Sequence, residues 1–180
     1  MRSIAPQVIW LTGLSGSGKS TLAKALERSF NKRGIKAFTI DGDVLRAISG
    51  HDLGFSKEDR SKNVMRAVTL AQEKLQQGWV VIVAMISPFI KDRENARSQF
   101  MPSQFKEVYV STPLSECEKR DPKGLYKQTR AGLILDMTGI NSPYEPPPSP
   151  DLEINTKDQS IETSVKMITQ KLLDDQIPYN

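Results

Sequence analysis

Apolar residues along the chain alternate between short continuous runs and longer stretches of helical spacing. The continuous runs predict five strands, at residues 8–11, 37–40, 80–84, 105–110 and 152–154. Apolar residues at every third or fourth position predict a helix after the first strand, a long helix over Lys57–Gln77 with Ser56 as its N-cap, and a C-terminal helix. The inward-facing positions are Leu22, Ala25, Leu26, Phe30, Val64, Val68, Ala71, Leu75, Ile161, Val165, Ile168 and Leu172.

This alternation predicts an α/β fold, in which a mostly parallel five-stranded sheet lies between two layers of helices. Ligands of such folds bind beyond the carboxyl ends of the strands, so chemistry is expected at 13–20, 41–46 and 85–88. The irregular stretch 121–150 is predicted to be a lid, because five of the eleven prolines fall in its last eight residues. No repeat or linker divides the chain, and one domain over 1–180 is expected.

Composition excludes several classes of protein. The 25 Lys+Arg and 21 Asp+Glu give a net charge of +4, and the two signs are interleaved, unlike the basic stripe of a nucleic-acid-binding protein. The longest apolar run, about Trp79 to Ile86, is too short to span a membrane, and the N-terminus has no signal-peptide pattern, so a cytoplasmic location is expected. The one cysteine, Cys117, excludes an intramolecular disulfide and is expected to pack as a small apolar residue.

Residues 13–20 match the phosphate-binding pattern G-x-x-x-x-G-K-[S/T]. Its glycines let backbone N–H groups point at phosphate oxygens, while Lys19 reaches the β- and γ-phosphates and the Ser20 hydroxyl can ligate Mg²⁺. A flexible turn is the alternative, but the motif lies between a buried strand and an amphipathic helix. The predicted nucleotide-binding residues are Gly13, Leu14, Ser15, Gly16, Ser17, Gly18, Lys19, Ser20 and Thr21.

The further motifs of a GTPase or a motor ATPase are missing from the sequence. Asn155–Asp158 has the wrong order for the base-reading motif N-K-x-D. Asp121–Gly124 fits D-x-x-G but follows a further predicted helix, which starts at Thr112–Pro113, rather than a strand. The strand that ends at Ala84 lacks the Walker-B aspartate. A small phosphotransferase therefore fits best.

Polar residues on the acceptor side follow the second strand. Asp41 and Asp43 are suited to orient Mg²⁺ and to accept a proton from an attacking hydroxyl, although a helix N-cap is an equal alternative. Arg60, Asn63 and Arg66 have the spacing i, i+3, i+6 on one helix and are suited to approach one anion, whereas the alternative is a solvated helix face.

With these blocks in order, the chain resembles the adenylylsulfate kinase family of P-loop kinases. The resemblance rests on IWLTGLSGSGKST, DGD-x-x-R, DLGFS-x-x-DR-x-x-N, ISP, RDPKGLY and TGI-x-SPYE-x-P. It implies a P-loop NTPase fold and transfer of the γ-phosphate of ATP, with Mg²⁺, to the 3′-hydroxyl of adenosine 5′-phosphosulfate (APS). The products would be ADP and 3′-phosphoadenosine 5′-phosphosulfate (PAPS), the activated sulfate of sulfate assimilation, and a homodimer is implied.

The resemblance also implies roles for individual residues. Asp43 would be the base or hydroxyl-orienting carboxylate, and Asp41 would support it and, with Ser20, the metal site. Phe55 would stack on the base of APS, although the residue alone is also consistent with a core position under a loop. The phosphosulfate and ribose would be held by Arg46, Arg60 and Asn63.

Further positions follow from the same resemblance. Ile86, Ser87 and Pro88 would border the acceptor pocket, and Lys123 would lie in the lid and exclude water. Ser87 corresponds to a family serine described as a phosphoserine intermediate, but in-line transfer from ATP needs no covalent relay, so we do not expect that role.

One residue departs from the family pattern. Met137 stands where an aromatic residue usually completes a sandwich on the acceptor base with the Phe55 counterpart. A tolerated substitution and an altered base preference are both open, so transfer to another nucleotide, such as cytidine diphosphoramidate, is an alternative. A nucleotide-binding regulatory paralogue is the non-enzymatic alternative, against which the intact Lys19, Ser20, Asp41 and Asp43 argue.

Three singletons complete the sequence predictions. His51, the one histidine, is expected to be a solvated residue of the acceptor loop. Trp10 and Trp79, which begin or flank strands, are expected to anchor the core.

Overall fold

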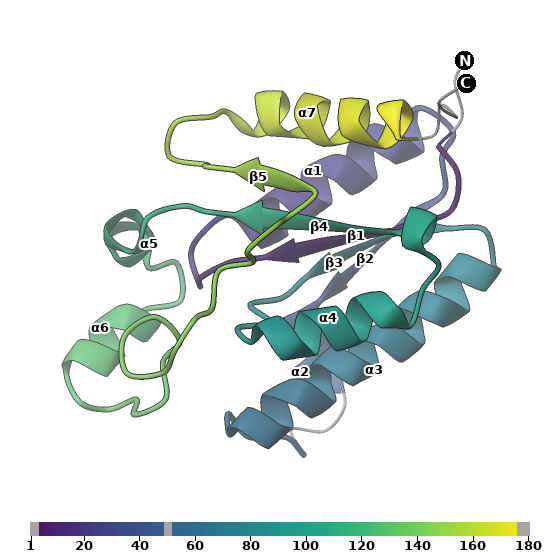
Figure 1. Cartoon of the computed structure of the whole chain (residues 1–180). Helices are drawn as coiled ribbons and strands as arrows, with labels where there is room; N and C mark the ends of the chain where they lie inside the picture. The colour runs from purple at the N-terminus through teal and green to yellow at the C-terminus, as the bar shows by residue number, and fades with distance from the viewer. Residues whose placement is uncertain (1–3, 49–51, 176–180) are drawn as a thin grey trace.

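The fold is built around a five-stranded sheet, seen in a computed structural model that describes residues 4–48 and 52–175 (Figure 1). The strands are β1 (Val8–Thr12), β2 (Ala37–Asp41), β3 (Val80–Ala84), β4 (Phe105–Val110) and β5 (Leu152–Ile154). All neighbouring strands pair in parallel in the order β2-β3-β1-β4-β5. The five predicted strands are confirmed to within one residue at each end, and the sheet is wholly rather than mostly parallel.

Helices cover both faces of the sheet, as the alternating pattern predicted (Figure 1). One face carries α1 (Lys19–Lys32) and α7 (Ile161–Asp174), and the other carries α2 (Gly42–Ile48), α3 (Lys57–Gln76) and α4 (Ile90–Ser98). The predicted N-cap of α3 is confirmed, because the Ser56 hydroxyl accepts a hydrogen bond from the Asp59 N–H at 3.1 Å. Neither α2 nor α4 stands out in the sequence, because seven and nine residues are too few to show a clear helical period.

Side chains of β1 alternate between the two layers of core. Ile9 and Leu11 pack toward α1 and α7, whereas Val8 and Trp10 pack toward α3. Trp10 is fully buried and stacks on Phe105 with 5.7 Å between ring centroids, which confirms it as a core anchor. Trp79 is half-buried and meets Phe38 edge-on. Some predicted inward positions lie at the margin of the core: Ala25, Leu75 and Val165 are half-buried, and Ile161 is exposed in the first turn of α7.

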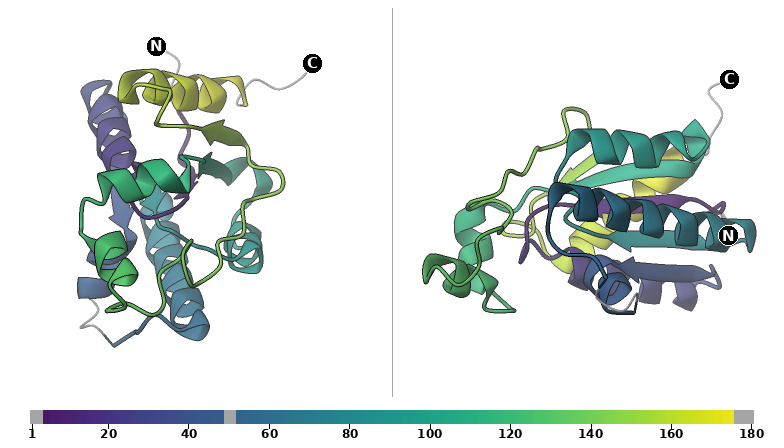
Figure 2. Two further views of the ribbon diagram at one scale, coloured as in Figure 1. Left: turned by 90° about the vertical axis from the view of Figure 1, so that its left-hand side faces the viewer. Right: turned by 90° about the horizontal axis from the view of Figure 1, so that it is seen from below.

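The carboxyl ends of the strands meet at one end of the molecule. Beyond them lie α5 (Leu114–Arg120), α6 (Leu125–Arg130) and the rest of the 121–150 segment, which Figure 2 shows from that end in its left view. This segment and α5 share a small apolar cluster around Cys117, Tyr126 and Met137. In the described part of the chain, no helix combines the length and the apolar character needed to cross a bilayer.

Candidate active site

The phosphate loop, residues 13–20, is shaped by glycines in conformations that other residues avoid. Gly13 has φ +152°, and a Cβ atom there would lie 2.5 Å from the Val110 carbonyl oxygen. Gly16 has φ +74°, and its Cβ would lie 2.9 Å from the Cys117 carbonyl oxygen. Because both obstacles are backbone atoms, a side chain at either position would displace the loop from β4 or from α5.

The outer side of the phosphate loop is held by hydroxyl groups from distant segments. Thr112 and Thr156 donate to the Ser17 carbonyl at 3.0 and 2.8 Å, and the Tyr126 hydroxyl donates to the Ser15 carbonyl at 2.8 Å. Carbonyl groups fixed on the outside favour an inner surface made of N–H groups, which is the arrangement that binds phosphate.

Lys19 is buried within the phosphate loop, with 8% of its surface exposed. Its ammonium group donates to the Leu14 carbonyl at 2.6 Å and to the Ser17 hydroxyl at 3.3 Å. Burial lowers the pKa of Lys19 to about 8, although the negative charges of Asp43 and Asp41 oppose that shift. The ammonium is therefore already desolvated and can exchange a carbonyl oxygen for a phosphate oxygen.

Asp41 combines the two roles that its sequence position left open. One carboxylate oxygen accepts the N–H groups of Asp43 and Val44 at 3.0 and 3.4 Å and so caps α2. The other accepts the Ser20 hydroxyl at 2.6 Å. Hydroxyl and carboxylate oxygens are ligands that Mg²⁺ prefers, so this pair fits the metal that accompanies a nucleotide.

A magnesium ion held by this pair would take its remaining ligands from nucleotide phosphates and water. Residues 4–48 and 52–175 contain no cluster of three or more His, Cys, Asp or Glu side chains that could hold a metal ion. Magnesium ions that are bound through one or two protein ligands and substrate phosphates are common in phosphotransferases.

Asp43 lies on the first turn of α2 with 68% of its side chain exposed. Its carboxylate forms an ion pair with the ammonium of Lys123, which comes from the 121–150 segment. The structure therefore brings together the predicted hydroxyl-orienting carboxylate and the predicted lid lysine, which are 80 residues apart in the chain.

Phe55 is 60% exposed, so the alternative of a core position under a loop is wrong. The guanidinium carbons of Arg46 and Arg60 lie 4.9 and 5.8 Å from the centroid of its ring. Arg46 also donates to the backbone carbonyls of Leu53 and Gly54, which fixes the loop that carries Phe55. An exposed ring between two guanidinium groups is suited to a planar base that carries an anionic group.

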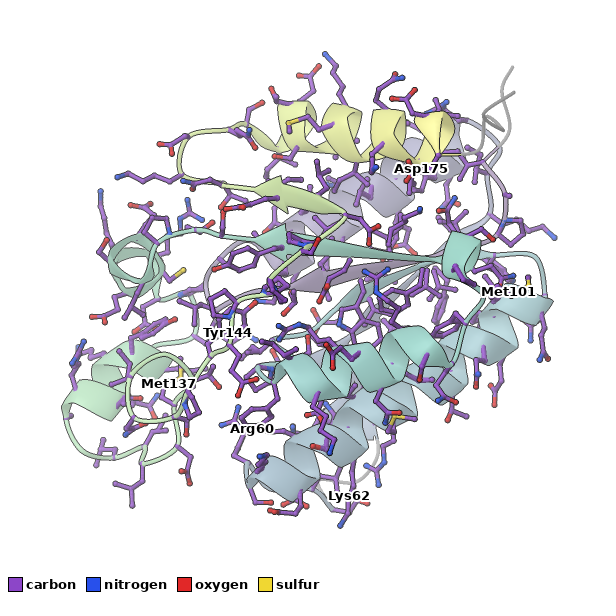
Figure 3. All side chains as sticks on the ribbon, in the orientation of Figure 1. Arg60, Lys62, Met101, Met137, Tyr144 and Asp175 are labelled. Carbon is purple, nitrogen blue, oxygen red and sulfur yellow. The ribbon has the colours of Figure 1, made fainter. Side chains whose placement is uncertain are left out.

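Arg60 links the Phe55 loop to the 121–150 segment (Figure 3). It donates to the Phe55 carbonyl at 2.8 Å, to the Thr138 hydroxyl at 2.7 Å and to the Asp136 carbonyl at 2.6 Å. Burial, and then the neighbouring charge of Arg46, lower the pKa of Arg60 from its usual value. No role was predicted for Thr138; only its place in the TGI motif could have pointed to it.

Asn63 is buried on α3, and its side chain is incompletely satisfied. Its amide nitrogen donates to the Gly42 carbonyl at 3.4 Å, while among the described residues its oxygen Oδ1 has no hydrogen-bond partner. Buried acceptors without a partner are rare, and a ligand hydroxyl would satisfy this one.

Arg66 does not join Arg60 and Asn63 at one anion, as the helical spacing had predicted. Its guanidinium instead pairs with both carboxylate oxygens of Asp52. This pairing holds the pKa of the Asp52 carboxyl below its usual range. An acidic neighbour across the loop outweighs helical spacing in deciding where the side chain goes.

The turn Ile86–Pro88 follows β3 beside the phosphate loop. Ile86 is half-buried, and Ser87 is buried with φ +39°. The Ser87 hydroxyl accepts the indole N–H of Trp10 at 3.1 Å. This engaged and buried hydroxyl gives no support to a phosphoserine role, in line with the sequence interpretation.

Met137 lies elsewhere than predicted. Its side chain is 6% exposed and packs in the apolar cluster with Cys117 and Tyr126, within the 121–150 segment (Figure 3). A flexible apolar thioether gains more from this cluster than from an exposed position opposite Phe55. With 6% of its surface exposed, Met137 offers little surface to a base that stacks on Phe55. Cys117 is buried as expected, and His51 lies outside the described residues.

A phosphate loop that faces paired carboxylates at the carboxyl end of a parallel sheet defines a P-loop phosphotransferase. The chain belongs to the adenylylsulphate kinase family, whose profile matches residues 5–155. The adenylyl-sulfate kinase of Pseudomonas aeruginosa is 48% identical over 167 residues, which are 93% of this chain and 85% of that protein.

Solved structures agree with this assignment. The APS kinase of Mycobacterium tuberculosis in complex with AMPPNP and APS is 43% identical with a TM-score of 0.89, and the match covers 93% of this chain and 98% of the other. A hexameric APS kinase from Thiobacillus denitrificans is 30% identical with a TM-score of 0.69, over 93% of this chain and 29% of the other.

Proposed function

We propose that this chain transfers the γ-phosphate of ATP to the 3′-hydroxyl of APS, giving ADP and PAPS for sulfate activation. The observation that carries the proposal is the position of Asp41 at the end of β2 and of Asp43 in the first turn of α2. Asp41 accepts the Ser20 hydroxyl on the donor side, and Asp43 lies on the same short helix as Arg46, whose guanidinium lies over the exposed Phe55 ring. Family membership supports the choice of acceptor, as does a similar kinase whose structure contains AMPPNP and APS.

On the donor side, the β- and γ-phosphates bind the inner N–H groups of the loop. Lys19 exchanges the Leu14 carbonyl for a phosphate oxygen, at little further cost in desolvation. Mg²⁺, when held by Ser20, Asp41 and the phosphates, neutralises charge on the transferring group.

On the acceptor side, Asp43 orients the 3′-hydroxyl and accepts its proton as the oxygen attacks the γ-phosphorus. Phe55 stacks on the base, Arg46 and Arg60 bind the phosphosulfate, and Asn63 accepts a ribose hydroxyl at its unpaired oxygen. Ile86 and Ser87 border this pocket. The phosphoryl group passes directly between the two nucleotides.

The 121–150 segment acts as the lid of the single domain 1–180. Three contacts support this role: Tyr126 with the phosphate loop, Lys123 with Asp43, and Arg60 with the chain at Asp136. Closure over both nucleotides excludes water and so limits hydrolysis of ATP.

The assembly and location are also proposed. We expect a homodimer, because members of the family are commonly dimers. We also expect the protein to lie in the cytoplasm. Light scattering of the purified protein should give twice the chain mass of 20.1 kDa; a monomer or a hexamer would contradict the dimer.

The choice of acceptor and the role of Asp43 are tested together by measuring the release of ADP from ATP in the presence of Mg²⁺. With APS the native protein should turn over faster than with cytidine diphosphoramidate. Asp43→Ala and Asp43→Asn should lower kcat by about 10²- to 10⁴-fold, because both remove the proton acceptor, while the KM for ATP changes little. Asn keeps the size of the side chain, so a similar loss in both variants attributes the effect to charge.

Each contrary outcome has a distinct meaning. Faster turnover of the cytidine compound would overturn the choice of APS. Full activity of Asp43→Ala would overturn the mechanism, and no ADP release with either acceptor would favour a binding protein.

A further inference from the structure

We propose that Tyr144 and Arg93 are positioning residues for the acceptor, which act by fixing the backbone of the turn Ile86–Pro88. The inference rests on the proposed function, in which this turn borders the acceptor pocket. It starts from the three successive carbonyl groups of the turn, each of which is held by a different donor.

The first carbonyl is held through a chain of two hydroxyl groups. Thr12 donates to the Ile86 carbonyl at 2.7 Å, and the Tyr144 hydroxyl lies 2.9 Å from the same threonine oxygen. A carbonyl only accepts, so the Thr12 proton points to Ile86 and Tyr144 must donate to Thr12. Burial raises the pKa of Tyr144, so its hydroxyl keeps the proton that it donates.

The second and third carbonyls are held by Arg93 and by the backbone of Glu145. Arg93 is 2% exposed and donates to the Ser87 carbonyl at 2.6 Å, while the Glu145 N–H donates to the Pro88 carbonyl at 2.8 Å. The Glu145 carboxylate also accepts the N–H of Ile90, the first residue of α4, at 2.7 Å.

Arg93 joins three parts of the chain with one planar group. Besides the Ser87 carbonyl it bonds the Glu145 carbonyl at 2.6 Å and the Glu107 carboxylate at 2.8 Å, and Glu107 balances its buried charge. A guanidinium directs its N–H groups along fixed directions, which an ammonium group cannot reproduce.

These contacts explain how Ser87 keeps its left-handed conformation of φ +39°. A residue other than glycine stays in that region only where its surroundings over-determine it. Tyr144 and Glu145 belong to the C-terminal end of the 121–150 segment, and Thr12 directly precedes the phosphate loop. The same contacts therefore set the acceptor turn relative both to the lid and to the bound phosphates.

The matched pair Tyr144→Phe and Tyr109→Phe tests this inference. The two rings stack with 6.0 Å between centroids, and each variant loses one hydroxyl, but only Tyr144→Phe loses the donor to Thr12. Tyr144→Phe should raise the KM for APS by about three- to tenfold, the effect of one lost hydrogen bond, and leave the KM for ATP within about twofold. Tyr109→Phe should change neither constant.

A second readout does not depend on the acceptor. Amide hydrogen exchange in the peptide that spans 85–90 should be faster in Tyr144→Phe than in the native protein or Tyr109→Phe. Arg93→Lys keeps the charge but loses the planar group with its N–H donors in fixed directions. It should therefore raise the KM for APS and the exchange rate further.

The outcomes separate this inference from the proposed function. A native protein inactive with APS would contradict the proposed function, and the exchange rates would still decide whether Tyr144 fixes the turn. Unchanged exchange in Tyr144→Phe would overturn the inference. So would equal changes in both KM values, since a general loss of structure would affect both ligands alike.

Discussion

The phosphate loop and the acceptor side meet where the Ser20 hydroxyl donates to Asp41, but they are built in different ways. The loop is fixed by backbone groups and buried donors, and its lysine is 8% exposed. The acceptor side presents exposed side chains, with Phe55 at 60% and the Asp43 side chain at 68%. Its contacts also reach across to the 121–150 segment. The donor site is thus largely buried and preformed, whereas the acceptor site depends on exposed side chains.

Of the changes compared next, removing the lysine of the preformed site should have the largest effect. Lys19→Met should lower kcat by about 10³-fold, because a desolvated charge at the transferring phosphate is lost. Thermal unfolding should show no loss of stability, since Met removes a buried ammonium that costs free energy to desolvate. Retention of a tenth or more of the native kcat would contradict the role given to Lys19.

Removing the exposed ring should impair the acceptor side alone. Phe55→Ala should lower kcat/KM for APS by about 10- to 100-fold, the range expected for one lost stacking contact, with the KM for ATP unchanged. The melting temperature should stay the same because the ring is mostly exposed. Met101→Ala is the matched control: Met101 is also 60% exposed but lies at the opposite end of the molecule (Figure 3), so kinetics should not change.

The pH dependence of nucleotide binding should distinguish the donor side from the acceptor side, with a smaller effect than the two substitutions above. The pKa of Lys19 is lowered from 10.5 to about 8, so above pH 8 the free protein loses the proton that ATP requires. Affinity for AMPPNP, measured by calorimetry, should fall by up to about tenfold per pH unit above pH 8. Lys19→Arg should not show this fall, because arginine keeps its charge.

The lowered pKa of Lys19 also makes the free energy of unfolding depend on pH. Between pH 8 and 10.5 the unfolded chain holds a proton on Lys19 that the folded chain has lost. The contribution of this group to the free energy of unfolding therefore increases as pH rises through that window. A decrease specific to native Lys19 and absent from Lys19→Met would contradict the buried position of the ammonium.

The smallest effect is expected at Arg66. Its guanidinium is paired with Asp52 at the surface, so Arg66→Gln should change kcat/KM for APS by less than about twofold and leave the free energy of unfolding nearly unchanged. A rise in the KM for APS comparable with that of Phe55→Ala would mean that Arg66 leaves Asp52 for the bound anion.

The difference between the phosphate loop and the acceptor side also explains which features could be predicted from the sequence. The strands and the phosphate loop depend on neighbouring residues and appear as continuous patterns, so their positions were predicted to within a residue. The short helices α2, α4 and α6 were not predicted, because seven, nine and six residues are too few to show a clear helical period. They take their places by packing and by caps such as the Asp41 carboxylate on α2.

On the acceptor side, local spacing was a weaker guide. Arg66 fitted the helical spacing of an anion site, but Asp52 took its charge. Met137 fitted the position of a family aromatic, but an apolar cluster buried it. Contacts such as Tyr144 with Thr12, 132 residues apart, exist only once the sheet has brought the two segments together.

The bond between Trp10 and Ser87 has a practical consequence. The chain has two tryptophans, and the second, Trp79, lies at the amino end of β3, away from the turn that follows this strand. In a Trp79→Phe protein, the fluorescence of the remaining indole comes from a ring whose N–H touches Ser87 of the acceptor turn. The fluorescence of Trp10 thus serves as an intrinsic reporter of acceptor binding. It can be followed in a stopped-flow instrument without attaching a dye.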